Sequence, residues 1–268
     1  MTVMLLVVAS AHPTMALAIE VRSELTVGRE FVYLTDDVEA ELADGQLALG
    51  AGITMVSDYA IERYGAQALL EYRGDKVSAG VAATFGPRQE ERGWASVDPH
   101  LELRLPIGVT TIRLEAGTLL RRIDAHQRRT RVAIDQLQLH GGLEVTLKER
   151  WRLAAFGLYS FYDPNPAASS LRDLDLGLAV TLAGRPERWA VGGRVARRLA
   201  PWMWLELGAA GVVYADGQGE AWVPRALVRL GAWRGFSMAT AMEVVVGVHG
   251  AAGDALREIG SVELEYER

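Results

Sequence analysis

The chain reads LELRLPIGVTTIRLEA from Leu101 to Ala116, with an apolar residue at nearly every second position on either side of a Pro-Ile-Gly break. Successive side chains of a β-strand point to opposite faces, so each arm of this segment has one aliphatic and one charged face. The pattern predicts a hairpin with a turn near Pro106–Val109. If that turn takes four residues, Glu102 lies opposite Arg113 and the two charges attract each other across the strands.

The same alternation recurs along the chain in segments of roughly 9–13 residues, longer than the usual strand of about 5–6 residues. A tilted strand that crosses a bilayer needs about 9–11 residues. We expect about 14 strands, accept 12 to 16, and expect an even number for closure. The expected strands are 19–27, 47–55, 66–73, 77–85, 94–105, 110–121, 131–147, 151–162, 171–182, 189–197, 203–214, 222–233, 236–249 and 256–266.

Composition excludes several classes of protein. The 268 residues are 50% hydrophobic and 23% charged, and no apolar run approaches the roughly 18 residues of a membrane-spanning helix. Cysteine is absent, which excludes disulfides and thiolate metal sites. The net charge of −6 argues against a nucleic-acid partner, because such binding depends on neutralising phosphates.

The chain is expected to divide into an export signal over 1–18 and a single β domain over 19–268, which forms the barrel. Residues 4–9 form a short apolar core, and 16–18 fit a small-residue cleavage site. No Lys or Arg precedes that core. A buried first strand is the other interpretation, which Pro13 disfavours because proline interrupts a strand ladder.

The connections and the tryptophans add two further signals. Short breaks at Pro106–Val109, Lys148–Arg150 and 234–235 contrast with longer polar stretches at 87–93 and 122–130, as in barrels with short periplasmic turns and longer outer loops. All seven tryptophans lie near expected strand ends, where a membrane interface concentrates them. The expected aromatic belt consists of Trp94, Trp151, Trp189, Trp222 and Trp233.

These residues together resemble a bacterial outer-membrane β-barrel of the porin-like kind. The resemblance rests on the alternation, the hairpin at 106–108, the aromatic strand ends and a final alternating strand that ends at Tyr266. It implies an all-β, antiparallel, up-and-down transmembrane barrel in the outer membrane. Outer-membrane lipid is then the expected partner, envelope proteins are further candidates, and the oligomeric state stays open.

The charged faces then line a lumen, since an arginine facing lipid at mid-membrane costs about 2–4 kcal/mol. Mixed signs on these faces predict ion-pair ladders. The candidate lumen residues are Arg22, Glu24, Glu71, Arg73, Glu102, Arg104, Arg113, Glu115, Arg194, Glu206, Arg225, Arg229 and Glu243.

Other chemistry finds little support in the sequence. His140 has no serine nucleophile beside it, and His249 with Asp254 lacks a third group. Asp173 and Asp175 have the spacing of any polar strand face, so we expect no metal site, no cofactor and no enzyme. The leading function is a passive channel or an export conduit for small solutes or polymer. A non-conducting scaffold that anchors a partner complex, and a soluble periplasmic β-sandwich or barrel, are the alternatives.

Overall fold

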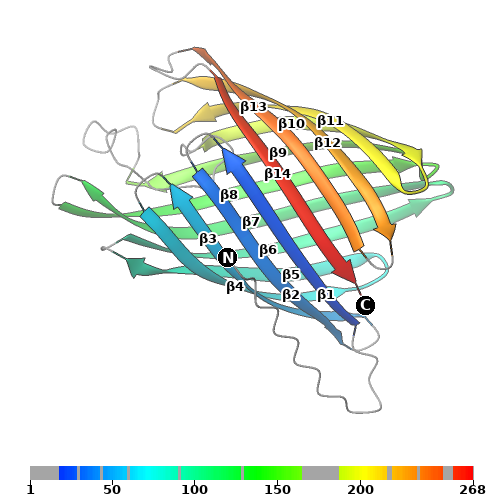
Figure 1. The fold of residues 1–268 in the computed structure, drawn as a ribbon, viewed down its shortest axis with the longest axis horizontal. Coiled ribbons are helices and arrows are strands. Elements are labelled where there is room, and N and C mark those ends of the chain that lie inside the picture. Colours follow the sequence, from blue (N-terminus) through cyan, green and yellow to red (C-terminus); the bar gives the residue numbers. More distant parts are fainter. Residues whose placement is uncertain are drawn as a thin grey trace.

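The computed structural model describes residues 18–28, 31–42, 45–58, 61–89, 92–127, 130–164, 187–215, 219–233, 236–249 and 256–267. These ranges form fourteen antiparallel strands joined in one closed barrel (Figure 1). The strands are β1 (Ala18–Gly28), β2 (Phe31–Leu42), β3 (Leu47–Asp58), β4 (Ile61–Arg73), β5 (Val77–Gln89), β6 (Arg92–Ile107), β7 (Thr110–Gln127), β8 (Thr130–Leu147), β9 (Trp151–Asp163), β10 (Glu187–Ala200), β11 (Met203–Tyr214), β12 (Glu220–Trp233), β13 (Phe236–His249) and β14 (Leu256–Glu267).

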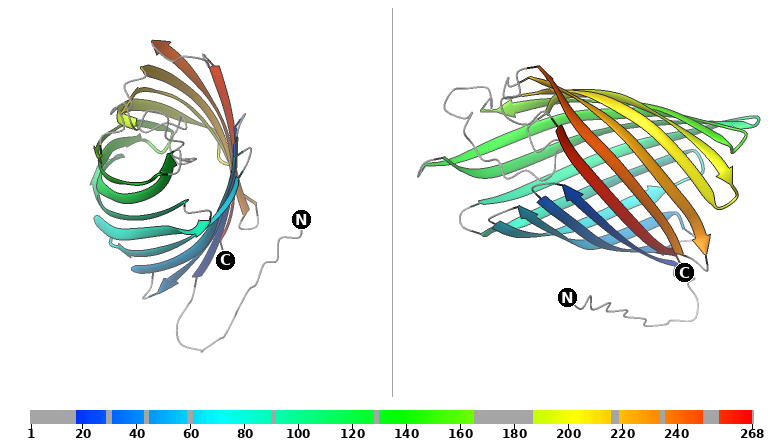
Figure 2. Two further views of the ribbon diagram at one scale, coloured as in Figure 1. Left: turned by 90° about the vertical axis from the view of Figure 1, so that its left-hand side faces the viewer. Right: turned by 45° about the horizontal axis from the view of Figure 1, so that its top comes forward.

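The strand order follows the sequence, and the barrel closes where β1 pairs with β14. Every strand therefore has two antiparallel neighbours, and no backbone edge is left to satisfy inside a membrane. The left-hand view in Figure 2 shows the sheet curving round on itself. The expected up-and-down barrel of about 14 strands is confirmed.

Strand β2 is the element that the alternation did not reveal. Its register places Asp36 on the outer face, where Ser23 of the neighbouring β1 donates a hydrogen bond to its carboxylate. The consecutive acids Asp36 and Asp37 interrupt the apolar positions that would otherwise mark a strand. The expected strand at 171–182 lies outside the described residues. The expected total of 14 strands is therefore met with β2 counted in place of that strand.

Tight turns join the strands at the end of the barrel where β1 begins and β14 ends. Between β6 and β7, Ile107 pairs with Thr110, so the turn has two residues, and Gly108 adopts a φ of 63°. The four-residue turn considered above is therefore wrong, and Glu102 lies opposite Glu115 rather than Arg113. A shift of two residues keeps every side chain on its expected face, because the side-chain period is two.

The long loops expected at 87–93 and 122–130 are also wrong. Strands β5 and β6 pair as far as Gln89 and Arg92, and β7 and β8 as far as Gln127 and Thr130. Beyond the apolar band a strand has no need of lipid-compatible side chains. The polar outer segments can continue the ladder there, as the exposed pair of Arg122 and Asp135 does at 3.6 Å.

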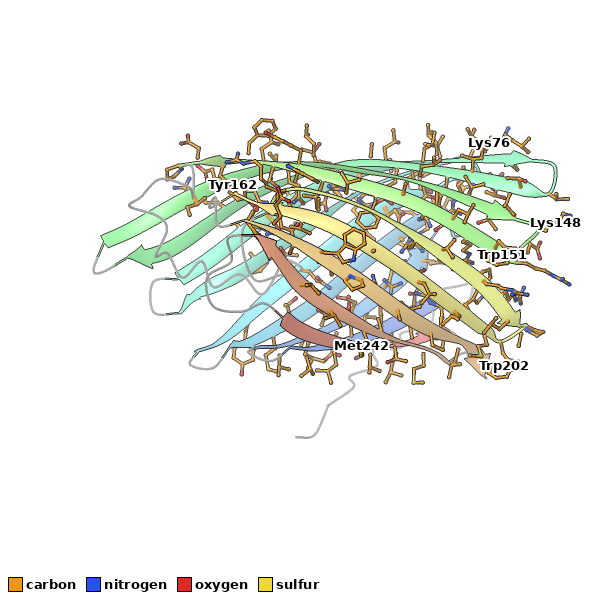
Figure 3. The ribbon with its side chains drawn as sticks, turned by 90° about the horizontal axis from the view of Figure 1, so that it is seen from above. Lys76, Lys148, Trp151, Tyr162, Trp202 and Met242 are labelled. Carbon is orange, nitrogen blue, oxygen red and sulfur yellow. The ribbon has the colours of Figure 1, made fainter. Side chains whose placement is uncertain are left out.

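The aliphatic face of the sheet points outward. Leu207, Val191 and Met242 are more than half exposed, whereas Glu102 on the opposite face is 6% exposed. Side chains project outward from the ribbon over the middle and the tight-turn end of the barrel (Figure 3). A soluble barrel would bury this aliphatic surface, so the soluble alternative is not supported. No helix in the described ranges is long and apolar enough to cross a membrane.

Candidate functional site: the charged lumen

The candidate site is the inner face of the barrel, defined by the strand register. Twelve of the thirteen expected lumen residues have described side chains, and their positions alternate with the exposed aliphatic ones. Glu243 pairs with the inward Arg225 in the register, and its side chain lies outside the described set. The charges fall into three groups around the barrel.

The first group, here called the acidic arc, covers the inner faces of β1 to β4. Arg73 is its centre, with ion pairs to Glu39 at 2.5 Å, to Glu41 at 2.7 Å and to Glu71 at 2.8 Å. Arg22 pairs with the neighbouring Glu20 at 2.8 Å. One guanidinium thus gathers carboxylates from two strands, which is the ladder expected for inward charges.

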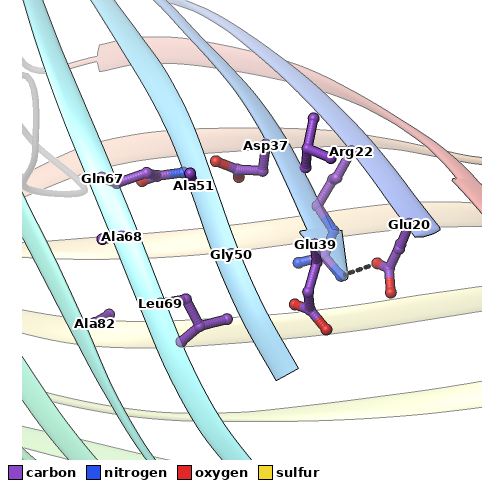
Figure 4. Close-up of a pocket in the computed structure, with 11 residues that line it drawn as sticks. Glu20, Arg22, Asp37, Glu39, Gly50, Ala51, Gln67, Ala68, Leu69 and Ala82 are labelled. Atoms are coloured by element: carbon purple, nitrogen blue, oxygen red, sulfur yellow. Dashed lines mark hydrogen bonds and ion pairs between the residues drawn. The ribbon is translucent and has the colours of Figure 1, made fainter. Parts of the chain in front are cut away.

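Carboxylates outnumber guanidiniums in the acidic arc. The described acidic side chains on this wall are Glu20, Glu24, Asp37, Glu39, Glu41 and Glu71, and the described basic ones are Arg22 and Arg73. Asp37 and Gln67 point toward one another over Gly52, where a Cβ would meet both side chains (Figure 4). The small residues between them leave a cavity of about 160 Å³ on this wall.

The second group lies on β6 and β7, with Glu144 of β8 opposite Arg113 in the register. Arg104 donates a hydrogen bond from Nε to Glu102 at 2.5 Å, and Arg113 pairs with the other oxygen of the same carboxylate. The expected attraction between Glu102 and Arg113 is therefore present, as a diagonal contact. Arg104 and Arg113 lie directly opposite each other, so Glu102 also separates two like charges.

The third group, the basic arc, covers the inner faces of β9 to β12. Its arginines are Arg152, Arg194, Arg198, Arg225 and Arg229. Arg194 reaches Glu144 at 3.4 Å and Glu206 at 3.8 Å. The guanidinium of Arg152 stacks over Trp204 at 4.3 Å from the ring centre. A cavity of about 320 Å³ lies between Arg194, Arg225 and Phe156.

Closure places these two arcs across the lumen from each other. In a ring of fourteen strands, β2 and β3 lie seven positions from β9 and β10. Walls of opposite charge that enclose a narrow space focus the electric field between them. The arrangement therefore produces a field directed across the lumen from the basic to the acidic arc.

Among the described side chains, those in the half of the lumen farther from the tight turns include fewer charges and pack more closely. His140 lies 3.7 Å from Asp98, and its ring covers Gly117. On β9 to β12 small and aliphatic side chains pack together on the inner face, and Ala190 and Val212 are almost fully buried. Gln136 donates hydrogen bonds to Ser160 at 3.4 Å and to Tyr162 at 3.2 Å.

Several lumen residues escaped the sequence analysis. They are Asp37, Glu39, Glu41, Glu144, Arg152 and Arg198. Three of these acids belong to β2, which was not recognised as a strand. The signal was present, because Thr35, Asp37, Glu39 and Glu41 alternate through β2 and match the inward parity of Glu20 and Arg22.

The aromatic residues divide between the two ends of the barrel. Trp151 starts β9 at the tight turns, whereas Trp189 and Trp222 lie at the opposite end, and all three are exposed on the outer face. The side chains of Trp94 and Trp233 are outside the described set. Trp204 differs from Trp151, Trp189 and Trp222 because its register places it on the inner face, opposite Arg229.

Comparison with known proteins supports the fold alone. No protein-family model matches the chain, and no curated protein sequence matches it. Among solved structures it is similar to Pseudomonas aeruginosa OccK1 (OpdK), at 9% identity and a TM-score of 0.52 over 94% of this chain and 98% of that one. It is also similar to P. aeruginosa OccK8 (OprE), at 8% identity and a TM-score of 0.51 over 95% and 98%.

The fold, the closed register and the outward aliphatic face together define a porin-like outer-membrane β-barrel. The predictions of this class, of an outer-membrane location and of a surrounding lipid environment are confirmed.

Proposed function

We propose that the barrel is a passive channel for small hydrophilic solutes. The observation that carries this proposal is the opposition of the acidic arc and the basic arc across the lumen. Burying unpaired charges without water costs free energy, so charges on opposite walls are more stable when water fills the space between them. A scaffold that conducts no ions or solutes would not need lumen walls of opposite charge.

The proposal assigns the charged rungs to ion and solute selection, because rings of fixed charge bias which ions pass at close quarters. The acidic arc would hold the positive part of a passing solute, and the cavity between Arg194 and Arg225 would hold the negative part. Neither step requires a cofactor, a metal or covalent chemistry, and we propose no enzymatic activity.

A non-conducting scaffold is the second candidate, and one observation favours it. In the half of the lumen away from the tight turns, Ile134, Ala190 and Val212 are at most 1% exposed although they lie on the inner face. Such packing narrows the path for water. Single-channel recording in a planar bilayer separates the two candidates, since a scaffold gives no conductance from folded protein.

The decisive variant replaces Arg225 and Arg229 with glutamate. This change inverts two charges of the basic arc, so the reversal potential in a salt gradient should shift toward cation preference. A matched control inverts two exposed turn cations, Lys76 and Arg150. Lys76 and Arg150 lie in turns at the rim and not on the wall of the lumen, so the control should leave the reversal potential nearly unchanged. Equal shifts in both variants would contradict selection by the basic arc.

We also propose residues 1–18 as an export signal, of which the structure describes only Ala18, the first residue of β1. Mass spectrometry of the protein isolated from a Gram-negative outer membrane should find a mature N-terminus close to Ile19. An intact Met1 in the folded, inserted protein would contradict this proposal.

A further inference from the structure

One surface outside the lumen combines cations and tryptophans at the edge of the aliphatic face. It consists of Lys148, Arg150, Trp151, Arg197 and Trp202, here called the basic collar, and all five side chains are exposed. Figure 3 shows Lys148, Trp151 and Trp202 at the tight-turn end of the barrel. The collar spans the β8–β9 turn and the β10–β11 turn.

Backbone hydrogen bonds fix the β8–β9 turn against β10 on one side and the β6–β7 turn on the other. The N–H of Arg198 donates to the carbonyl of Arg150 at 2.8 Å, and the N–H of Lys148 donates to the carbonyl of Val109 at 3.0 Å. Trp151 pairs with Arg197 in the register. The cations of the collar therefore occupy fixed neighbouring positions rather than a loose loop.

Arg197 is the residue that joins the collar to the membrane. Its register position is on the outer face, between Val195 and Leu199, which are both exposed. Its guanidinium stacks over the ring of Trp151, 5.1 Å from the centre. An outward arginine near the end of a strand lies where lipid headgroups begin, and a tryptophan ring is most stable at the same level.

Among the described residues, the cations of the collar, Lys148, Arg150 and Arg197, have no carboxylate partner. The single acid in the turn is Glu149. The β4–β5 turn at the same end differs, because its one cation, Lys76, is balanced by one acid, Asp75.

The backbone geometry of the β8–β9 turn also indicates that the side chains of Lys148 and Glu149 have a role beyond forming the turn. Lys148 and Glu149 both adopt positive φ angles, of 49° and 54°. Two other described turns at this end place glycine at such a position, Gly45 at 81° and Gly108 at 63°. Glycine accepts this conformation without the steric cost that lysine and glutamate incur. A chain that needed only a turn would gain stability from glycine here.

We infer that the basic collar is a binding site for the headgroup of an anionic phospholipid. The phosphate would lie among Lys148, Arg150 and Arg197, with the acyl chains along the exposed Val195 and Leu199 and the tryptophan rings at the level of the glycerol backbone. Arginine suits this role because its fork of N–H donors matches phosphate oxygens. The inference does not depend on whether the barrel conducts.

The absence of cysteine from the chain allows a local test. A single Leu199→Cys substitution carries a thiol-reactive fluorophore on the outer face beside the collar, and Val77→Cys carries the same fluorophore beside the β4–β5 turn. Each labelled barrel is reconstituted in phosphatidylcholine vesicles that contain nitroxide-labelled phosphatidylglycerol or nitroxide-labelled phosphatidylcholine. The ratio of quenching by the two labelled lipids reports local preference for the anionic headgroup.

The ratio should exceed unity at position 199 and stay close to unity at position 77. Replacing Lys148, Arg150 and Arg197 together with glutamine should lower the relative association constant for phosphatidylglycerol at position 199, by about fivefold for each cation lost. Salt at about 0.5 M should lower it as well, because exposed charges are screened.

Equal ratios at positions 199 and 77 would overturn the inference, and so would an unchanged ratio in the triple variant. Heat-modifiable migration in detergent gels shows whether each variant is folded. If the triple variant does not fold, the single Arg150→Gln variant and a salt titration of the unsubstituted protein test the inference instead. Both should lower the quenching ratio at position 199, and an unchanged ratio in both would overturn the inference. A channel measurement is not involved, so failure here leaves the proposed function intact.

Discussion

Replacing Glu102 with glutamine should destabilise the barrel more than any other single charge removal in the β6–β8 group. Glu102 is 6% exposed, and its carboxylate forms ion pairs with both Arg104 and Arg113. Glutamine keeps the shape and loses the charge. The two arginines, which lie opposite each other in the register, then face each other without the carboxylate between them.

The contacts of Glu102 set the expected magnitude. Hydrogen bonds to charged groups contribute about 1.5–3 kcal/mol each, and removal of one partner from a buried pair costs about 3–5 kcal/mol. Arg104 and Arg113 are nearly half exposed, so water in the lumen recovers part of that loss. Repulsion between directly opposed like charges adds up to about 1 kcal/mol. We expect a loss of about 3 kcal/mol in the free energy of unfolding.

Glu115→Gln is the matched control. Glu115 lies opposite Glu102, is exposed, and has no cationic partner among the side chains that the structure describes. The same charge change there should alter stability by less than about 0.5 kcal/mol, toward stabilisation because it removes a like charge facing Glu102. Urea unfolding of barrels in lipid vesicles, followed by tryptophan fluorescence, measures both. Equal losses in the two variants would refute the reasoning from the ion-pair geometry.

Further predictions concern the outer face, the packing of the lumen and the channel current. Ser23→Ala should lower the free energy of unfolding by about 1–3 kcal/mol, because Asp36 then lacks its hydrogen-bond donor on the lipid-facing side. In an Asp36→Leu background the same substitution should cause no measurable loss, and an equal loss in both backgrounds would contradict this prediction. Gly117→Ala should cost about 1–3 kcal/mol because the new Cβ meets the His140 ring, whereas Gly211→Ala, whose Cβ meets nothing within 4 Å, should be neutral in the same urea assay. Raising the salt from about 0.1 to 1 M should reduce the ion selectivity of any conductance, since the screening length falls from about 10 to 3 Å; constant selectivity would indicate a neutral constriction.

The sequence alone determined the class of fold and the face of each recognised strand. A period of two residues, sustained over a bilayer-crossing length, allows one aliphatic and one charged face, and only a closed barrel satisfies the backbone of such strands in lipid. Leu103 and Leu114 could be assigned to the outside and Glu102 and Arg113 to the inside before any coordinates, because an error of two residues in register changes no face.

The tertiary structure decided which charges meet. The two-residue turn at Gly108 placed Glu102 opposite Glu115 and made its contact with Arg113 diagonal, and turn length cannot be read from the alternation on either side. Strand β2 was hidden because Asp36 faces outward and depends on Ser23 of another strand for its hydrogen bond. Only closure of the ring placed the acids of β2 on the opposite wall from the arginines of β9 to β12. Their relative position around the barrel depends on the number of strands between them and not on any local sequence pattern.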